Sequence, residues 1–282
     1  MRSLRPIHLA LIGACLLTIV LLSFVSTTPS EGYKSEVAQE TEQHPAVPIE
    51  AVVQEERSSL KPDQSGVIAS LEQAIKGESS VVRRGILYDS LVKYLGYTGK
   101  YVLAAYYAEE KAKQNNGSGS DWMNAGERYR SAASFQQHED HLPAVYKSAI
   151  ACFEKALQLD PGNLDAQTGL GIAMVDGTND PMSGIKILQA VDSIDSTHIN
   201  SQLALADFAV RTQQYDKAIE RYSRVLKLKP EYYAIHLSLA ELYSAKYDTA
   251  NVIVQLKAYS AVTDDPVMKA EIDEEISKLV KK

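Results

Sequence analysis

A stretch of roughly 34 residues, Ile199–Tyr232, constrains this chain more than any other part of its sequence. Small and apolar side chains recur at helical spacing in two blocks, over 205–209 and again over 218–226. A polar turn at 212–214 separates the blocks. Pro230 ends the second block, because proline lacks an N–H and disfavours helix at the preceding residue. The stretch therefore predicts a helix hairpin, and neighbouring units must stack on it to bury its apolar face.

The order of small and large side chains in this unit resembles the tetratricopeptide repeat (TPR) family. The matching residues are Leu205 and Ala206, Tyr215 at the start of the second helix, and then Ala218, Tyr222, Val225 and Pro230. The resemblance implies an all-α fold, a TPR-like α-solenoid of stacked helix hairpins. It also implies a non-catalytic scaffold or adaptor that mediates protein–protein interactions.

Copies of the pattern, with imperfect matches, divide the chain into segments. Trp122, Gly126 and Tyr129 match the first helix of one unit, and Leu170 with Gly171 match the next. The predicted segments are a signal anchor or transmembrane helix (1–27), a disordered acidic Pro-containing linker (28–65), N-terminal helices with a divergent TPR (66–118), a TPR array over 119–265 (units 119–163, 164–198, 199–232 and 233–265), and a C-terminal capping helix (266–282). An insertion around 136–143 is expected to lengthen the helices of the first unit or to protrude as a loop.

The N-terminal segment predicts a membrane anchor. Ile7–Val25 is almost entirely apolar, and at ~1.5 Å per residue it is long enough to cross the hydrocarbon core. Arg2 and Arg5 precede it and acidic residues follow, which places the N-terminus inside. We expect a single-pass protein whose TPR domain faces the periplasm, in the inner membrane of a Gram-negative bacterium. Two alternatives stay open, namely a cleaved periplasmic or secreted protein, and a lipoprotein anchored at Cys15.

Composition limits the other partners and the chemistry. The formal net charge of −7 at pH 7 argues against nucleic acid as a partner. The linker is rich in Pro, Glu and Gln and cannot bury enough apolar surface to offset its ordering entropy. The sequence offers no catalytic residues, no cofactor-binding motif and no metal-ligand spacing. A metal-binding protein or enzyme that uses His138, Glu139, Asp140 and His141 is the alternative from another functional class.

By matching position, the resemblance also predicts which residues line a protein-binding groove on the first helix of each unit. They are Met123, Glu127, Arg130, Asp165, Thr168, Ile172, Asn200, Leu203, Asp207, Arg211, Leu237, Glu241 and Ser244. Such a mixed, mildly acidic groove suits a protein or peptide partner. TPRs that clamp a carboxylate use Lys and Asn where Met123 and Glu127 stand here, so that ligand is not expected. An assembly factor for an envelope complex, like the TPR proteins of cytochrome c maturation, is the alternative within the same class.

Overall fold

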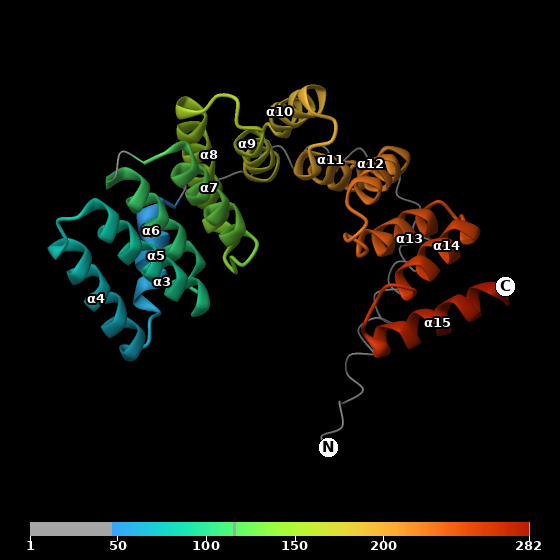
Figure 1. Cartoon of the computed structure of the whole chain (residues 1–282), viewed down its shortest axis with the longest axis horizontal. Coiled ribbons are helices and arrows are strands. Elements are labelled where there is room, and N and C mark those ends of the chain that lie inside the picture. The colour runs from blue at the N-terminus through green and yellow to red at the C-terminus, as the bar shows by residue number, and fades with distance from the viewer. Residues whose placement is uncertain (1–46, 115–116, 282) are drawn as a thin grey trace, which may run out of the picture. The chain divides into compact units, whose positions relative to one another are not determined.

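The computed structural model describes residues 47–114 and 117–281, and every regular element among them is helical. The elements are α3 (Ile49–Ser58), α4 (Pro62–Gly77), α5 (Val81–Tyr97), α6 (Tyr101–Gln114), α7 (Gly119–Ala133), η1 (Glu139–His141), α8 (Leu142–Leu159), α9 (Leu164–Gly177), α10 (Pro181–Ile194), α11 (Ile199–Arg211), α12 (Tyr215–Leu228), α13 (Ile235–Ala245), α14 (Thr249–Ser260) and α15 (Pro266–Val280). From α5 onward they pack as successive hairpins, α5 on α6 through α13 on α14 (Figure 1). The predicted all-α fold of stacked helix hairpins is confirmed.

The predicted anchor (1–27) lies outside the described residues. Among the helices that the structure describes, none combines the length and the apolar character that crossing a bilayer requires.

Small residues set the close approach of the two helices within a hairpin. In the α11/α12 hairpin, Ala206 and Ala218 are both fully buried and Tyr222 is 7% exposed, in agreement with the sequence pattern. In the α9/α10 hairpin, a Cβ built on Gly184 would lie 2.5 Å from the backbone oxygen of Gly171. The backbones of α9 and α10 therefore touch at a point where no side chain fits.

Three hairpins turn through a residue with a left-handed backbone. Gly99, Gln213 and Tyr247 have φ values of 74°, 57° and 59° and follow α5, α11 and α13, respectively. In each turn the next residue's N–H donates to a carbonyl five positions back, for example Gln214 to Ala209 at 2.8 Å. Left-handed backbone suits glycine, so the Gln and Tyr at these positions carry a conformational cost.

The N-terminal part of the described chain corrects one prediction. We expected a disordered linker to continue to residue 65, but residues 49–58 form α3, and α4 already begins at Pro62. Val52 and Val53 of α3 are buried, and the carboxylate of Glu56 accepts a hydrogen bond from the first-turn N–H of Leu103 on α6. These contacts hold α3 in place, so the prediction is wrong for 47–65. Residues 28–46 lie outside the described range.

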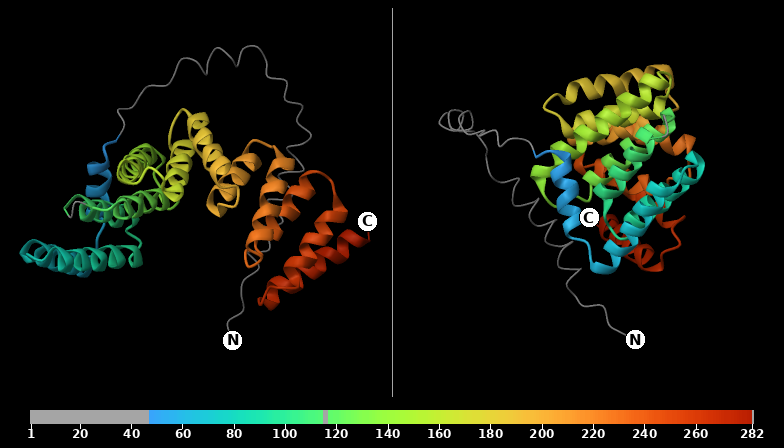
Figure 2. Two further views of the ribbon diagram at one scale, coloured as in Figure 1. Left: turned by 45° about the horizontal axis from the view of Figure 1, so that its top comes forward. Right: turned by 90° about the vertical axis from the view of Figure 1, so that its left-hand side faces the viewer.

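The insertion forms a turn followed by a short 3-10 helix, and the C-terminal segment forms the helix α15. After α7 the chain turns through 134–138 and forms η1 before α8 begins at Leu142, so the expected loop is compact. At the other end α15 runs beside α14 (Figure 2). It buries Ile272, and Asp273 accepts a hydrogen bond of 2.9 Å from the hydroxyl of Ser260.

Candidate functional site

A groove of about 720 Å³ crosses the first helices of three consecutive hairpins, α7, α9 and α11. Its lining residues are Met123, Glu127 and Arg130 of α7, Asp165, Thr168, Ile172, Val175 and Asp176 of α9, Leu188 of α10, and Asn200, Leu203, Ala204, Asp207, Phe208 and Arg211 of α11. The first helices lie next to one another because α7 contacts α9 and α9 contacts α11. The groove therefore belongs to the stacked arrangement and not to any single hairpin.

The structure brings ten of the thirteen predicted groove residues together in this hollow. The three that it does not bring there are Leu237, Glu241 and Ser244, which lie on α13. The third and fourth hairpins meet through α12 and α13. The connection between them, 229–234, is also two residues longer than 195–198, which joins the second and third. The extension of the groove to the fourth unit is therefore not seen in this structure.

Five lining residues were not predicted, and they are of three kinds. Val175 and Asp176 lie one turn beyond Ile172 on the same helix, so extending the predicted groove face by one turn would have included them. Ala204 and Phe208 are sequence neighbours of the predicted Leu203 and Asp207. Leu188 comes from the second helix, α10, and no first-helix pattern could indicate it. It passes close over Gly171, where its Cγ would be 2.8 Å from an added Cβ.

Two ion pairs hold the arginines of the groove. Arg130 Nη2 lies 2.6 Å from Glu127 Oε2 within α7. Arg211 Nη1 at the end of α11 lies 2.7 Å from Asp176 Oδ1 at the end of α9, and its guanidinium also stands 5.7 Å from the ring centre of Phe208. Each guanidinium thus has a carboxylate partner inside the groove.

The two remaining carboxylates of the groove have weaker partners. Asp165 Oδ1 accepts a 3.0 Å hydrogen bond from Asn200 Nδ2 and lies 3.2 Å from His198 Nε2, at the start of α9 and α11. Asp207 accepts a hydrogen bond from the Tyr222 hydroxyl of α12. Burial, together with this hydrogen bond, raises the pKa of Tyr222, so the hydroxyl stays a donor. The partners of Asp165 and Asp207 are therefore amide, imidazole and phenol groups and not guanidinium or ammonium groups.

Thr168 is the least expected member of the lining. Its side chain is 2% exposed, and its Oγ1 has no hydrogen-bond partner among the described residues. A buried hydroxyl without a partner costs about 1–3 kcal/mol. Thr168 is therefore a buried polar residue of the lining whose hydrogen bond the described residues do not supply.

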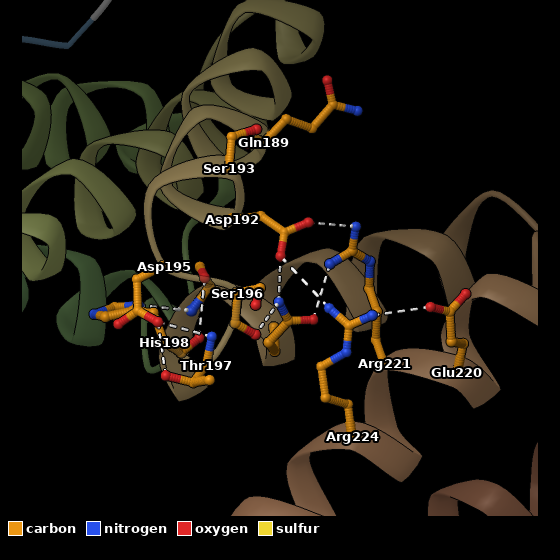
Figure 3. Close-up of polar contacts among 12 residues, drawn as sticks. Gln189, Asp192, Ser193, Asp195, Ser196, Thr197, His198, Glu220, Arg221 and Arg224 are labelled. Carbon is orange, nitrogen blue, oxygen red and sulfur yellow. Dashed lines mark hydrogen bonds and ion pairs between the residues drawn. The ribbon is translucent and has the colours of Figure 1, made fainter.

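A second polar cluster lies at the junction of α10, α11 and α12, and its groups are mutually satisfied. Figure 3 shows the carboxylate of Asp192 facing Arg221 and Arg224, with Arg221 Nη2 at 3.1 Å from Oδ2. Arg221 also donates to the buried Gln202 at 2.9 Å, and Gln202 donates to the carbonyl of Ser196 at 3.0 Å. This closed network joins two hairpins and is best understood as structural.

The histidines considered as metal ligands face a single carboxylate. The rings of His138 and His141 lie 5.0 Å apart, and their Nε2 atoms are 3.7 and 3.4 Å from the carboxylate of Glu55 on α3. Across 47–114 and 117–281, His, Cys, Asp and Glu side chains form no group of three or more that could hold a metal. The turn therefore contacts α3 through Glu55.

Comparisons with known proteins agree with this architecture. Residues 210–246 match a family model described as TPR repeat, and residues 146–163 match one described as tetratricopeptide repeat. The chain therefore contains tetratricopeptide repeats, as the pattern at 199–232 predicts.

Individual known proteins are similar to this chain in sequence or in structure. A segment of 83 residues is 39% identical to the RNA polymerase-associated protein CTR9 of Saccharomyces cerevisiae, a match that covers 29% of this chain and only 7% of that protein. A tetratricopeptide repeat protein from Parabacteroides merdae is similar in structure, with a TM-score of 0.53 and 14% identity over 83% of this chain and 86% of that one. MamA gives a TM-score of 0.46 and 18% identity over 67% and 97%. At these identities the structural likeness concerns the fold alone.

Proposed function

We propose that this protein is a tetratricopeptide-repeat scaffold that holds a polypeptide segment of another protein in the groove between α7, α9 and α11, without catalysis of its own. The observation that carries the proposal is the lining of that groove. It combines apolar and charged side chains along the first helices of three consecutive hairpins. Extended peptides and partner helices are recognised by surfaces of this kind.

The proposal includes a membrane tether. Its support is the apolar sequence Ile7–Val25 with basic residues before it and acidic residues after it. A tether there would hold the repeats near a bilayer, on the periplasmic side. Carbonate extraction of membranes from the native host tests this part. The full chain should remain in the pellet, and its release by carbonate would refute the tether.

Site-specific photo-crosslinking tests the groove. A benzophenone amino acid is placed at Met123 or Leu203 in the groove, or at Val82 or Val267, which are 74% and 65% exposed on α5 and α15. In cells that make the protein natively, the two groove positions should give the same adducts, and the two control positions should not. The groove assignment fails if all four positions give the same adducts, or if only the control positions react.

A further inference from the structure

The charges that line the groove do not balance. Four carboxylates and two guanidiniums face it, which leaves a net charge of −2. Both guanidiniums are already engaged, Arg130 with Glu127 and Arg211 with Asp176. The excess negative charge therefore belongs to the other two carboxylates of the lining.

Asp165 and Asp207 are these two carboxylates, and both remain accessible. Among the residues that the structure describes, no Lys or Arg nitrogen lies within 4.0 Å of either side chain. The side chain of Asp165 is 57% exposed, and Asp207 is exposed on the adjacent helix. They come from neighbouring first helices, α9 and α11, so a single bound segment can reach both.

An independent observation at the same groove also indicates a ligand. The Oγ1 of Thr168 is buried and has no hydrogen-bond partner in the described part of the chain, although the residue lies in the groove lining. The side chain lies three residues from Asp165, one turn along the same face of α9. A polypeptide backbone supplies N–H and C=O groups that can form hydrogen bonds with such a hydroxyl.

We propose that the groove selects a polypeptide segment that carries Lys or Arg side chains next to apolar ones. The basic side chains pair with Asp165 and Asp207, the apolar side chains cover the floor at Ile172 and Phe208, and the backbone meets Thr168. This inference rests on the proposed function and specifies the partner's charge. Acidic segments are rejected, because each would bring like charge against unmatched carboxylates.

Three pools of displayed 12-residue peptides test the selection against the full chain in detergent. In each pool random apolar residues alternate with Lys or Arg, with Asp or Glu, or with Gln or Ser. The Lys/Arg pool should be retained preferentially. Its retention should fall steeply between 50 and 300 mM salt, because exposed charge pairs are screened over about 10 Å at ordinary ionic strength.

Two matched double variants distinguish the effect of the charges in the groove from the effect of the protein's net charge. Asp165→Asn with Asp207→Asn keeps the acceptor oxygens for Asn200 and Tyr222, so the fold is preserved. This double variant should lose about tenfold in affinity for the Lys/Arg pool, since each exposed ion pair contributes a few-fold. The control, Glu271→Gln with Glu275→Gln on the exposed face of α15, removes the same charge and should bind as the wild type does.

Each other outcome has a definite meaning. Equal retention of the three pools, preference for the Asp/Glu pool, or an equal loss in the control variant overturns the charge selection and leaves the scaffold proposal intact. Retention of no pool overturns the charge selection. It overturns the scaffold proposal as well only if the crosslinking at Met123 and Leu203 is also negative. Self-association that blocks the Lys/Arg pool would make a second copy of this chain the occupant and would refute an external basic segment.

Discussion

Replacing Thr168 by valine should stabilise the protein. The Thr168 hydroxyl is buried without a partner in the described structure, which costs about 1–3 kcal/mol. Valine has nearly the same shape and a similar helix propensity, so the substitution removes the polar atom and changes little else. We therefore expect the free energy of unfolding to rise by about 1–2 kcal/mol. For a chain of this size that corresponds to a melting temperature higher by about 2–4 °C per kcal/mol.

A second threonine of the same helix region provides the control. Thr178, at the end of α9, donates to the carbonyl of Met174 at 2.7 Å and accepts from the N–H of Asp180 at 3.1 Å. Thr178→Val removes two satisfied hydrogen bonds, each with a net contribution of about 0.5–1.5 kcal/mol, and should destabilise the protein. The two substitutions are chemically identical and should act with opposite sign.

Urea unfolding followed by circular dichroism at 222 nm measures both variants. Thr168→Val should raise the midpoint without changing the slope, and Thr178→Val should lower it. A lower midpoint for Thr168→Val would mean that the hydroxyl already has a partner, such as a bound water, and would refute the reasoning. The same variant should bind the Lys/Arg peptide pool more weakly. A stabilised variant with unchanged binding would remove Thr168 from the site but leave the stability argument standing.

Four further predictions concern packing, the backbone and the buried thiol. Gly184→Ala should lower the free energy of unfolding by about 1–3 kcal/mol, because its Cβ would lie 2.5 Å from a backbone oxygen of the facing helix. Gly66→Ala, with nothing within 4 Å in α4, should raise it by about 0.5–1 kcal/mol, and urea midpoints compare the two. Tyr247→Gly should also stabilise by about 0.5–1 kcal/mol in the same assay, because Tyr247 is 93% exposed at a φ of 59°. In a Cys15→Ser background, Cys152 should react with a disulfide reagent at pH 8 far more slowly in the native chain than in urea. The reason is that the thiol is 1% exposed and burial raises its pKa; equal rates would contradict this.

The sequence predicted the third unit and its neighbours well because their constraint is local. Where two helices of a hairpin cross, small residues must face each other, and Ala206 with Ala218 meets that demand. A fixed repeat then places one side chain per turn on the groove face, and Asp165 and Asn200 fall at matching positions 35 residues apart. The resemblance to the TPR family, applied at this repeat spacing, therefore indicated the residues that line the groove on α7, α9 and α11.

The fourth unit shows where spacing stops being informative. Asn163 and His198 cap α9 and α11 through side-chain hydrogen bonds, but Ala234 before α13 makes no such bond. The longer connection at 229–234 also changes how α13 follows α12. The position of a helix relative to the preceding hairpin depends on these details of the loop. A repeat pattern does not contain them.

The prediction for the segment before the repeats was wrong for a different reason. Its composition is that of a linker, yet α3 is held by contacts with residues far along the chain. Glu56 reaches the start of α6, and Arg57 pairs with Glu72 of α4 at 2.9 Å. Burial raises the pKa of Glu56, in keeping with a carboxyl group enclosed by the fold. Long-range partners of this kind leave no periodic trace in the local sequence.

The floor of the groove also joins two parts of the apolar core. One cluster of buried side chains ends on α9 with Ala173, and another begins on α11 with Ala206. Between them lies a small cluster of Ile185, Leu188 and Leu205, against which the groove residues Ile172, Val175, Ala204 and Phe208 pack. A segment bound in the groove covers this cluster and contacts α9 and α11 together. Binding must then stabilise the fold, by about 2.7 kcal/mol at a hundred times the dissociation constant. The urea midpoint of the chain should therefore rise as the groove becomes occupied by a bound segment.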